Sequence, residues 1–253
     1  MNSDEIERYA RHLILKDIGG PGQQKLKSAR VLIVGAGGLG APAALYLAAA
    51  GVGTLGLMDD DVVSLSNLQR QVLFGTENIG EDKTTAAART LGRLNPHIHI
   101  ATHKGRFDKH SVGQLDEYDL VLDGTDNFAS RFVINTACHQ TGTPLVSGAA
   151  ISFEGQVACF HSHGGKTPCY RCLVPTLPDE GDTCETVGVI GALTGVIGAM
   201  MALEAIKIIT RSGDPLYGRL MVFDGLGAVW RVLDLPRDPA CPVCGDQPLD
   251  KSP

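Results

Sequence analysis

The chain has 253 residues, 43% of them hydrophobic and 20% charged, so it is long enough to bury the core of a globular protein. Its net charge of −6 and its aromatic content of 5% argue against general nucleic-acid binding and against stacking platforms for single strands. The N-terminus has no basic segment followed by an apolar run, so we expect no signal peptide and a cytoplasmic protein.

The first 150 residues alternate between predicted helices and strands. A helix is expected over residues 4–18, ended by the turn GGPG at 19–22. Its predicted apolar positions are Ile6, Tyr9, Ala10, Leu13 and Ile14. We then expect strands over 31–35, 54–59, 97–103 and 144–151, an apolar strand running into a polar turn over 119–127, and helices over 39–50, 81–94 and 129–140. This order predicts a doubly wound α/β fold with a mostly parallel sheet, which binds ligands beyond the carboxyl ends of its strands.

The remaining residues predict an antiparallel extension of this sheet. A short turn precedes residues 154–161, and two further strands are expected over 219–225 and 228–235. The apolar stretch 187–203 approaches the length of a membrane span. Its Gly and Thr content, with charged residues directly after it, favours a buried helix, so we expect no membrane span. We predict one domain over residues 1–253, with a nucleotide-binding half at 1–150 and a second half at 151–253.

A glycine-rich turn follows the first predicted strand. Gly35, Gly37 and Gly40 form G-x-G-x-x-G, which permits a tight turn and a close approach of phosphate to a helix N-terminus. Asp59 follows Gly40 by 19 residues, the spacing of a carboxylate that binds a ribose. Taken alone, this motif favours a nicotinamide or flavin enzyme.

Two cations follow the second strand. In the segment SLSNLQRQVLF at 64–74, helical spacing would put Asn67, Arg70 and Gln71 on one face and direct Arg70 at the strand ends. Lys83 adds a second cation. A hydride transfer needs neither, whereas a reaction that releases pyrophosphate does, because charge builds on the departing oxygens. The alternative is a solvated amphipathic helix.

A pair of aspartates ends a later strand, in the sequence LDGTDN at 122–127. Asp123 and Asp126 could bind a divalent ion that accompanies a triphosphate. The alternative for Asp126 or Asn127 is the N-cap of the next helix.

Four of the seven cysteines form two C-x-x-C pairs, Cys169 with Cys172 and Cys241 with Cys244, separated by 68 residues. The fold would have to bring the pairs together, and a structural Zn²⁺ would then hold the C-terminus to the body. Redox dithiols and an iron–sulfur cluster are the alternatives. Cys184 precedes the apolar helix and is either a nucleophile or a small apolar residue. We expect Cys138 and Cys159 in the core and His161 and His163 on the surface.

Together these motifs resemble the ThiF/MoeB (HesA/MoeB/ThiF) family, the bacterial E1-like enzymes that adenylate ubiquitin-like sulfur carriers. The resemblance covers essentially the whole chain and rests on R-Y-x-R at 8–11, GAGGLG, DDD at 59–61, SNLQRQ, LDGTDN, VSGAAI, CYRC, GVIGALTGVIG and CPVCG. It implies a homodimer that binds ATP–Mg²⁺ and a small carrier protein ending in Gly-Gly. The carrier's carboxylate would attack the α-phosphate, releasing pyrophosphate, and the second half of the chain would bind the carrier, the partner subunit and zinc.

The resemblance also implies roles for individual residues. Asp59 and the glycines, with Gly38 among them, would hold the nucleotide. The phosphates would be lined by Ser66, Asn67, Leu68, Gln69 and Arg70 and neutralised by Arg70 and Lys83. Asp126, with Asn127, would face the metal and the nucleotide. Arg11 would enter the partner subunit's site, and Cys184 matches a position that some members link covalently to the carrier.

Two other functions stay open at this stage. An NAD- or FAD-dependent oxidoreductase would use the glycine turn and Asp59 but leave the cations and cysteine pairs without a role. A non-catalytic scaffold would bind a carrier without adenylating it. The sequence leaves the carrier open between MoaD-type and ThiS-type proteins, hence between molybdopterin and thiamine biosynthesis. Because it shows no fused rhodanese domain, we expect a separate sulfur donor.

Overall fold

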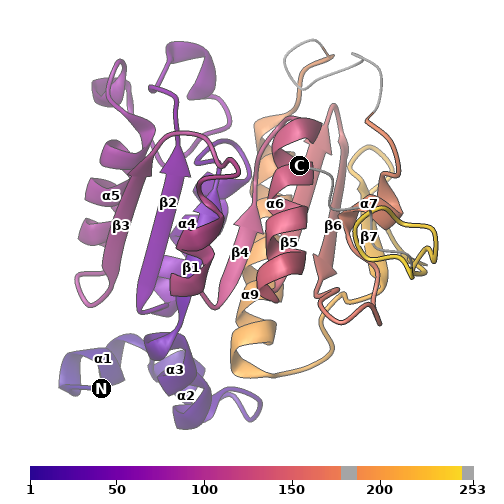
Figure 1. Ribbon diagram of the computed structural model, residues 1–253. Coiled ribbons are helices and arrows are strands. Elements are labelled where there is room, and N and C mark those ends of the chain that lie inside the picture. The colour runs from indigo at the N-terminus through magenta and orange to yellow at the C-terminus, as the bar shows by residue number, and fades with distance from the viewer. Residues whose placement is uncertain (178–186, 247–253) are drawn as a thin grey trace.

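The structure is a computed structural model that describes residues 1–177 and 187–246 (Figure 1). Its helices, labelled as in Figure 1, are α1 (Ser3–Arg8), α2 (Ala10–Leu13), α3 (Gly19–Ser28), α4 (Gly40–Ala50), α5 (Lys83–Leu94), α6 (Phe128–Thr141), α7 (Tyr170–Leu173) and α9 (Gly191–Thr210). Its strands are β1 (Arg30–Val34), β2 (Thr54–Asp59), β3 (His99–Lys104), β4 (Leu120–Asp123), β5 (Leu145–Ile151), β6 (Glu154–Phe160), β7 (Arg219–Asp224) and β8 (Val229–Asp234). Short 3₁₀ helices are η1 (Leu65–Asn67), η2 (Thr76–Asn78) and η3 (Val112–Glu117).

The described strands form one sheet in the order β3-β2-β1-β4-β5-β6-β7-β8. The pairings among β1 to β5 are parallel, and β6, β7 and β8 are added antiparallel. The predicted α/β fold with an antiparallel C-terminal extension is confirmed. Because β1 lies between β2 and β4, the loops that leave the carboxyl ends of these three strands meet at one edge.

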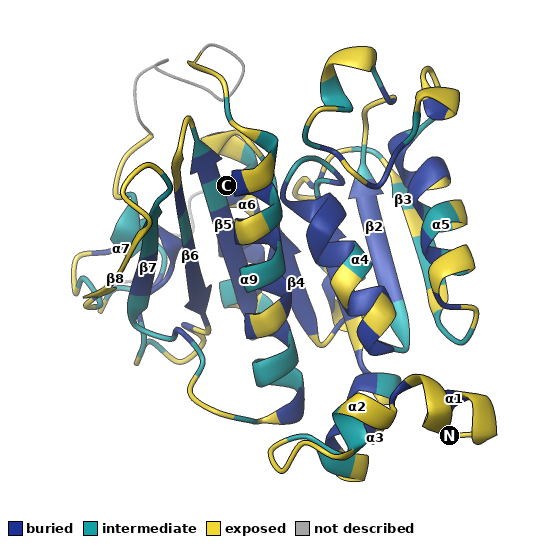
Figure 2. Cartoon of the chain, turned by 180° about the vertical axis from the view of Figure 1, so that it is seen from behind, coloured by how far each residue is buried: buried dark blue, intermediate teal, exposed yellow. Residues whose placement is uncertain are grey.

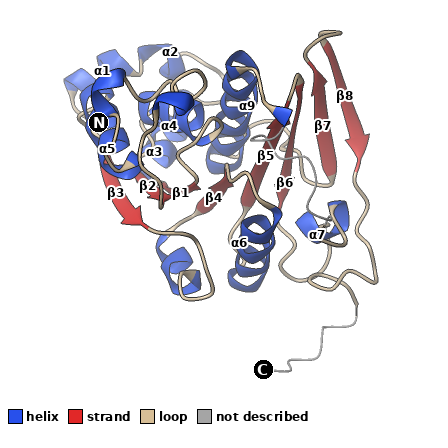
Figure 3. Cartoon of the chain, turned by 90° about the horizontal axis from the view of Figure 1, so that it is seen from above, coloured by secondary structure: helices blue, strands red, loops and turns tan. Residues whose placement is uncertain are grey.

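Helices cover both faces of the sheet (Figure 3). Val31 and Ile33 of β1 pack in the core with α4, α5 and α9, whereas Leu32 and Val34 pack with α6 on the other face. All four are nearly inaccessible, and Figure 2 shows the central strands as the most buried part of the chain. Burial on both faces explains why this strand is apolar throughout instead of alternating.

The 20-residue helix α9 is a core helix of this fold. By length and composition alone it could cross a membrane, with a mean hydropathy of 1.8. It packs, however, against α4 and against strands β5 and β6. Its Glu204 is buried, and that carboxylate accepts hydrogen bonds from Lys207 Nζ at 2.6 Å and from Leu216 N at 2.9 Å. The predicted buried helix is therefore confirmed, although it extends further than residue 203.

The prediction of one helix over residues 4–18 is wrong. Tyr9 separates α1 from α2, and its buried hydroxyl accepts a hydrogen bond from Asn95 Nδ2 at 2.8 Å. Ile6 and Ile14 are 50% and 74% exposed, so they do not form the expected core face. The GGPG sequence does not end a helix but begins α3, whose first turn tolerates proline because its N–H groups lack helical partners.

Candidate active site

The glycine turn joins β1 to α4 with almost no room for side chains. Gly35 has φ +88°, a backbone conformation that disfavours other residues. A Cβ at Gly40 would lie 1.9 Å from the Gly35 carbonyl oxygen, and one at Gly35 would lie 3.0 Å from the Gly124 backbone. The turn after β1, the start of α4 and the end of β4 are thus packed backbone on backbone, as a phosphate cradle requires.

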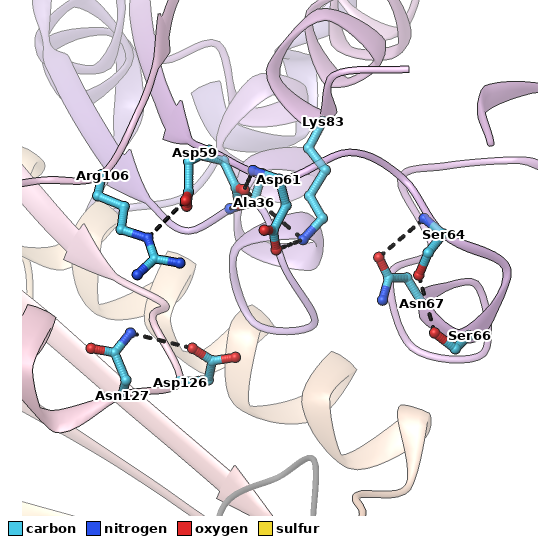
Figure 4. A network of polar contacts seen from close by, with 11 residues as sticks. Ala36, Asp59, Asp61, Ser64, Ser66, Asn67, Lys83, Arg106, Asp126 and Asn127 are labelled. Carbon is cyan, nitrogen blue, oxygen red and sulfur yellow. Dashed lines mark hydrogen bonds and ion pairs between the residues drawn. The ribbon is translucent and has the colours of Figure 1, made fainter. Parts of the chain in front are cut away.

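Asp59, at the end of β2, is hydrogen-bonded to the glycine turn. Its Oδ2 accepts from Ala36 N at 2.7 Å, and its Oδ1 accepts from Asp61 N at 2.9 Å. Burial raises the pKa of Asp59, and the charge of nearby Lys83 partly offsets that effect. Lys83 is itself buried, with Nζ 2.7 Å from Asp61 Oδ2 and 3.9 Å from Asp59 Oδ1. These contacts put a buried cation beside the predicted ribose carboxylate (Figure 4).

The segment after β2 is not the helix that we considered over residues 64–74. The 3₁₀ helix η1 is followed by turns, and Asn67 Oδ1 accepts a hydrogen bond from Ser64 N at 3.3 Å. The hydroxyls of Ser64 and Ser66 lie 3.0 Å apart, and Arg70 Nη1 donates to the Ser66 carbonyl at 3.1 Å. The hydrogen bond to Ser66 therefore positions the Arg70 guanidinium against its own segment.

Two residues connect this segment to the glycine turn, Thr194 and Gln71. Sequence reasoning missed Thr194. Thr194 of α9 packs against Gly38, and its hydroxyl, which donates to the Gly191 carbonyl at 2.8 Å, lies 3.5 Å from the Arg70 carbonyl oxygen. The Gln71 amide nitrogen lies 3.7 Å from where a Gly37 Cβ would be. The Gln71 side-chain oxygen is buried and, among the described residues, has no hydrogen-bond partner. An unpartnered amide oxygen beside the turn fits a site that a polar ligand completes.

Asp126 and Asn127 follow β4 at the same edge. Asn127 is the N-cap of α6, because its Oδ1 accepts from Ser130 N at 2.8 Å, and its Nδ2 donates to Asp126 Oδ1 at 3.5 Å. Asp123 is fully buried, and its two oxygens accept from Thr125 Oγ1 at 2.7 Å and Ser147 Oγ at 3.0 Å. Of the two predicted aspartates, Asp126 is the one exposed to a ligand.

Arg106 is a second residue that sequence reasoning missed. It follows β3, and its Nε donates to Asp60 Oδ2 at 2.7 Å. Figure 4 shows its guanidinium between Asp59 and Asp61, at the end of β2, and the pair Asp126 and Asn127. Its position three residues beyond the strand predicted over 97–103 was the available signal.

The two C-x-x-C pairs come together, as predicted, in one four-thiol cluster. Cys169 Sγ lies 3.6 Å from Cys241 Sγ, and Cys172 Sγ lies 3.4 Å from Cys244 Sγ. Zn–S bonds of about 2.3 Å in a tetrahedron put sulfurs about 3.8 Å apart, so the cluster fits this metal closely. The Asp238 N–H donates to Cys172 Sγ at 3.4 Å, a bond that supports a thiolate. The hydrogen bond from the Cys169 thiol lowers the pKa of Cys172 to about 5.

Other predicted residues lie away from this edge. Arg11 is exposed on α2, beyond the amino ends of the strands and so at the opposite end of the sheet from the glycine turn (Figure 1). Cys184 lies outside the described residues. Cys138 and Cys159 are buried and His161 and His163 are exposed, as predicted.

The glycine turn, Asp59, Lys83 and the loop after β4, at the carboxyl ends of a parallel sheet, define a nucleotide-binding α/β protein. The ThiF family matches residues 9–243. The chain belongs to this family, and with it to the adenylyltransferases, as the following relatives support.

The sulfur carrier protein adenylyltransferase of Thermus thermophilus is 46% identical over 98% of this chain and 94% of its own length. The adenylyltransferase and sulfurtransferase MOCS3 of Anopheles gambiae is 49% identical over 98% of this chain, which spans 57% of that relative. A crystal structure of Escherichia coli MccB with ATP superposes with a TM-score of 0.82 at 25% identity, covering 94% of this chain and 75% of that one.

Proposed function

We propose that the chain catalyses the ATP-dependent adenylation of the C-terminal carboxylate of a small ubiquitin-like sulfur carrier ending in Gly-Gly. The products are an acyl-adenylate and pyrophosphate. The 46% identity to a sulfur carrier protein adenylyltransferase, over nearly the full length of both chains, is the observation that carries this proposal. The buried Lys83 and the ordered segment after β2 support it over the oxidoreductase, which needs neither.

The proposed mechanism depends on alignment and charge. The nucleotide phosphates lie over the Gly35–Gly40 turn, near the N-terminus of α4, and the ribose hydrogen-bonds to Asp59. Because the attacking group is a carboxylate that is already ionised, no general base is required. Negative charge builds on the departing diphosphate, and Arg70 and Lys83 neutralise it there, with Ser66, Asn67, Leu68 and Gln69 lining the phosphates.

Two metals accompany this function. Mg²⁺ prefers carboxylate and phosphate oxygens, so Asp126 would hold it, with Asn127 beside that carboxylate. The ion would supply charge neutralisation on the triphosphate. Zn²⁺ would bind Cys169, Cys172, Cys241 and Cys244 and would have a structural role, because the cluster lies far from the glycine turn in the fold.

We propose that the enzyme is a cytoplasmic homodimer in which Arg11 enters the partner subunit's site. A chain's own Arg11 is at the wrong end of the sheet to serve its own site, which supports this arrangement. The domain would act as one unit, with residues 1–150 binding the nucleotide and residues 151–253 binding carrier, partner and zinc. The sulfur would come from a separate protein, and adenylation itself would not require Cys184.

The decisive experiment is carrier-dependent exchange of labelled pyrophosphate into ATP. Purified chain would be mixed with MoaD-type and ThiS-type carriers, each with and without its terminal Gly-Gly. We expect exchange with at least one intact carrier and none with the truncated forms, and mass spectrometry should detect the acyl-adenylate. Carrier binding without exchange would indicate a scaffold, and an NADH absorbance change without exchange would indicate an oxidoreductase.

A further inference from the structure

Arg106 is a cation at the edge of the nucleotide site to which the proposed mechanism gives no role. Its side chain is 74% exposed and ends in an ion pair, Nε to Asp60 Oδ2, at 2.7 Å. It follows Gly105, whose φ of +138° is a backbone conformation that other residues rarely adopt. The ion pair with Asp60 holds the end of this exposed side chain near the carboxyl end of β2.

The position of Arg106 relative to Asp59 and Asp61 distinguishes it from the residues that we propose line the phosphates. Figure 4 shows Ser64, Ser66 and Asn67 on one side of Asp59 and Asp61, and Arg106 on the other side. A nucleotide with phosphates over the glycine turn and its ribose on Asp59 has its base beyond the ribose, away from the phosphates. That direction leads to Arg106, which lies on the side of Asp59 opposite Ser66 and Asn67.

We propose that Arg106 lies over the base of the bound nucleotide and positions it through the plane of its guanidinium. The inference rests on the proposed function, because it requires an adenine nucleotide at this edge. A guanidinium is planar, always charged and weakly hydrated, and it stacks on aromatic rings. Asp60 accepts from Nε on one edge of the guanidinium, and because the side chain is largely exposed, the face of the guanidinium is open to a base.

The test measures equilibrium binding of ATP, AMP and inorganic tripolyphosphate by calorimetry. For Arg106→Ala we expect affinity for ATP and for AMP to fall by the same factor, about five- to tenfold, with tripolyphosphate binding unchanged. Arg106→Lys should show most of this loss, because an ammonium group lacks the plane. In kinetics, KM for ATP should rise by a similar factor while kcat changes little.

The matched control is Lys104→Ala. Lys104 is an exposed cation two residues earlier, but its Nζ pairs with Asp82 Oδ1 at 2.8 Å, so all three affinities should stay at the wild-type values. Unchanged ATP binding by Arg106→Ala, an equal loss for tripolyphosphate, or full recovery by Arg106→Lys would each overturn the base contact. A wild-type chain that binds neither ATP nor AMP would overturn the proposed function as well.

Discussion

At the scale of residues, Asp59 shows how the site holds charge at a cost in stability. Burial raises its pKa, so between the usual and the raised value the folded chain keeps a proton that the unfolded chain has released. The contribution of this group to stability therefore falls as the pH rises through that window. Lys83 and the two backbone N–H groups limit the loss, and the carboxylate stays ready for a ribose.

Arg70 and Asp126 should be essential to chemistry without being essential to folding. We expect Arg70→Ala and Asp126→Ala each to lower the adenylation rate on the order of 100-fold, about 3 kcal/mol of barrier. Arg70→Ala removes a cation from the departing diphosphate, and Asp126→Ala removes the carboxylate that would hold Mg²⁺ there. Pyrophosphate exchange measures the rate, and thermal unfolding checks the fold. Arg93→Ala and Asp116→Ala, exposed residues away from the glycine turn, are the charge-matched controls. Full exchange by either test variant would remove the role assigned to that residue.

At the scale of elements, the sequence predicted the central strands best. A buried parallel strand such as residues 31–35 is an unbroken apolar run, and a glycine turn bounds it, so its limits are visible locally. The order of helices and strands then implied which strand ends meet. It correctly predicted that Asp59 and Asp126 lie at the same edge of the sheet.

The sequence could not predict which contacts individual side chains make in the fold. The prediction for residues 4–18 failed because Ile6 and Ile14 have helical spacing but no described core to pack against. The helix considered over 64–74 failed because the side chain of Asn67 caps its own segment. Arg106 follows β3 and Thr194 is in α9, and neither element carries a sequence motif typical of nucleotide binding.

The start of α9 should control the position of the segment that carries Arg70. A Cβ at Gly191 would lie 2.1 Å from the Gln69 carbonyl oxygen, so Gly191→Ala must displace this segment. We expect about tenfold slower exchange and a lower unfolding temperature. Gly195→Ala, in the same helix with nothing within 4 Å of its Cβ, should keep the rate and gain up to about 1 kcal/mol of stability. Equal rates for both variants would contradict the proposed packing effect.

The thiol cluster should bind a metal that stabilises the fold and not the reaction. We expect about one zinc ion per chain, lost in Cys241→Ser, with an unfolding temperature lower by several degrees. The initial exchange rate of still-folded Cys241→Ser, measured at low temperature, should stay near that of the wild type. Cys138→Ala, a buried thiol outside the cluster, should retain zinc by elemental analysis. A metal-free wild type, or zinc needed for the chemical step alone, would refute this assignment.

At the scale of the whole molecule, the N-terminal helices raise the question of a second subunit. Ile6, Ile14 and Leu15 are each at least half exposed near Arg11, on the part of the chain that departs most from the prediction. Several exposed apolar side chains in one part of a chain favour contact with another surface. The proposed homodimer would cover them and supply a partner for Arg11.

Mixing two inactive variants tests this arrangement. In a dimer of Arg11→Ala with Arg70→Ala, one site receives both wild-type arginines and the other receives neither. Random mixing should therefore restore about one quarter of the wild-type exchange rate, whereas a chain with both substitutions should restore none. Mixtures no more active than the separate variants would mean that the arginines serve the same chain.

Helix α9 spans the distance between the proposed nucleotide site and the end of the sheet where Arg11 lies. Its first turn lies against Gln69 and Arg70, and near its last residue Lys25 Nζ of α3 donates to the Thr210 carbonyl at 2.6 Å. Twenty helical residues span about 30 Å, far beyond the reach of any arginine. An enzyme whose site needs an arginine from the partner subunit would lose specific activity on dilution. Its rate would therefore depend on protein concentration as well as on substrate concentration.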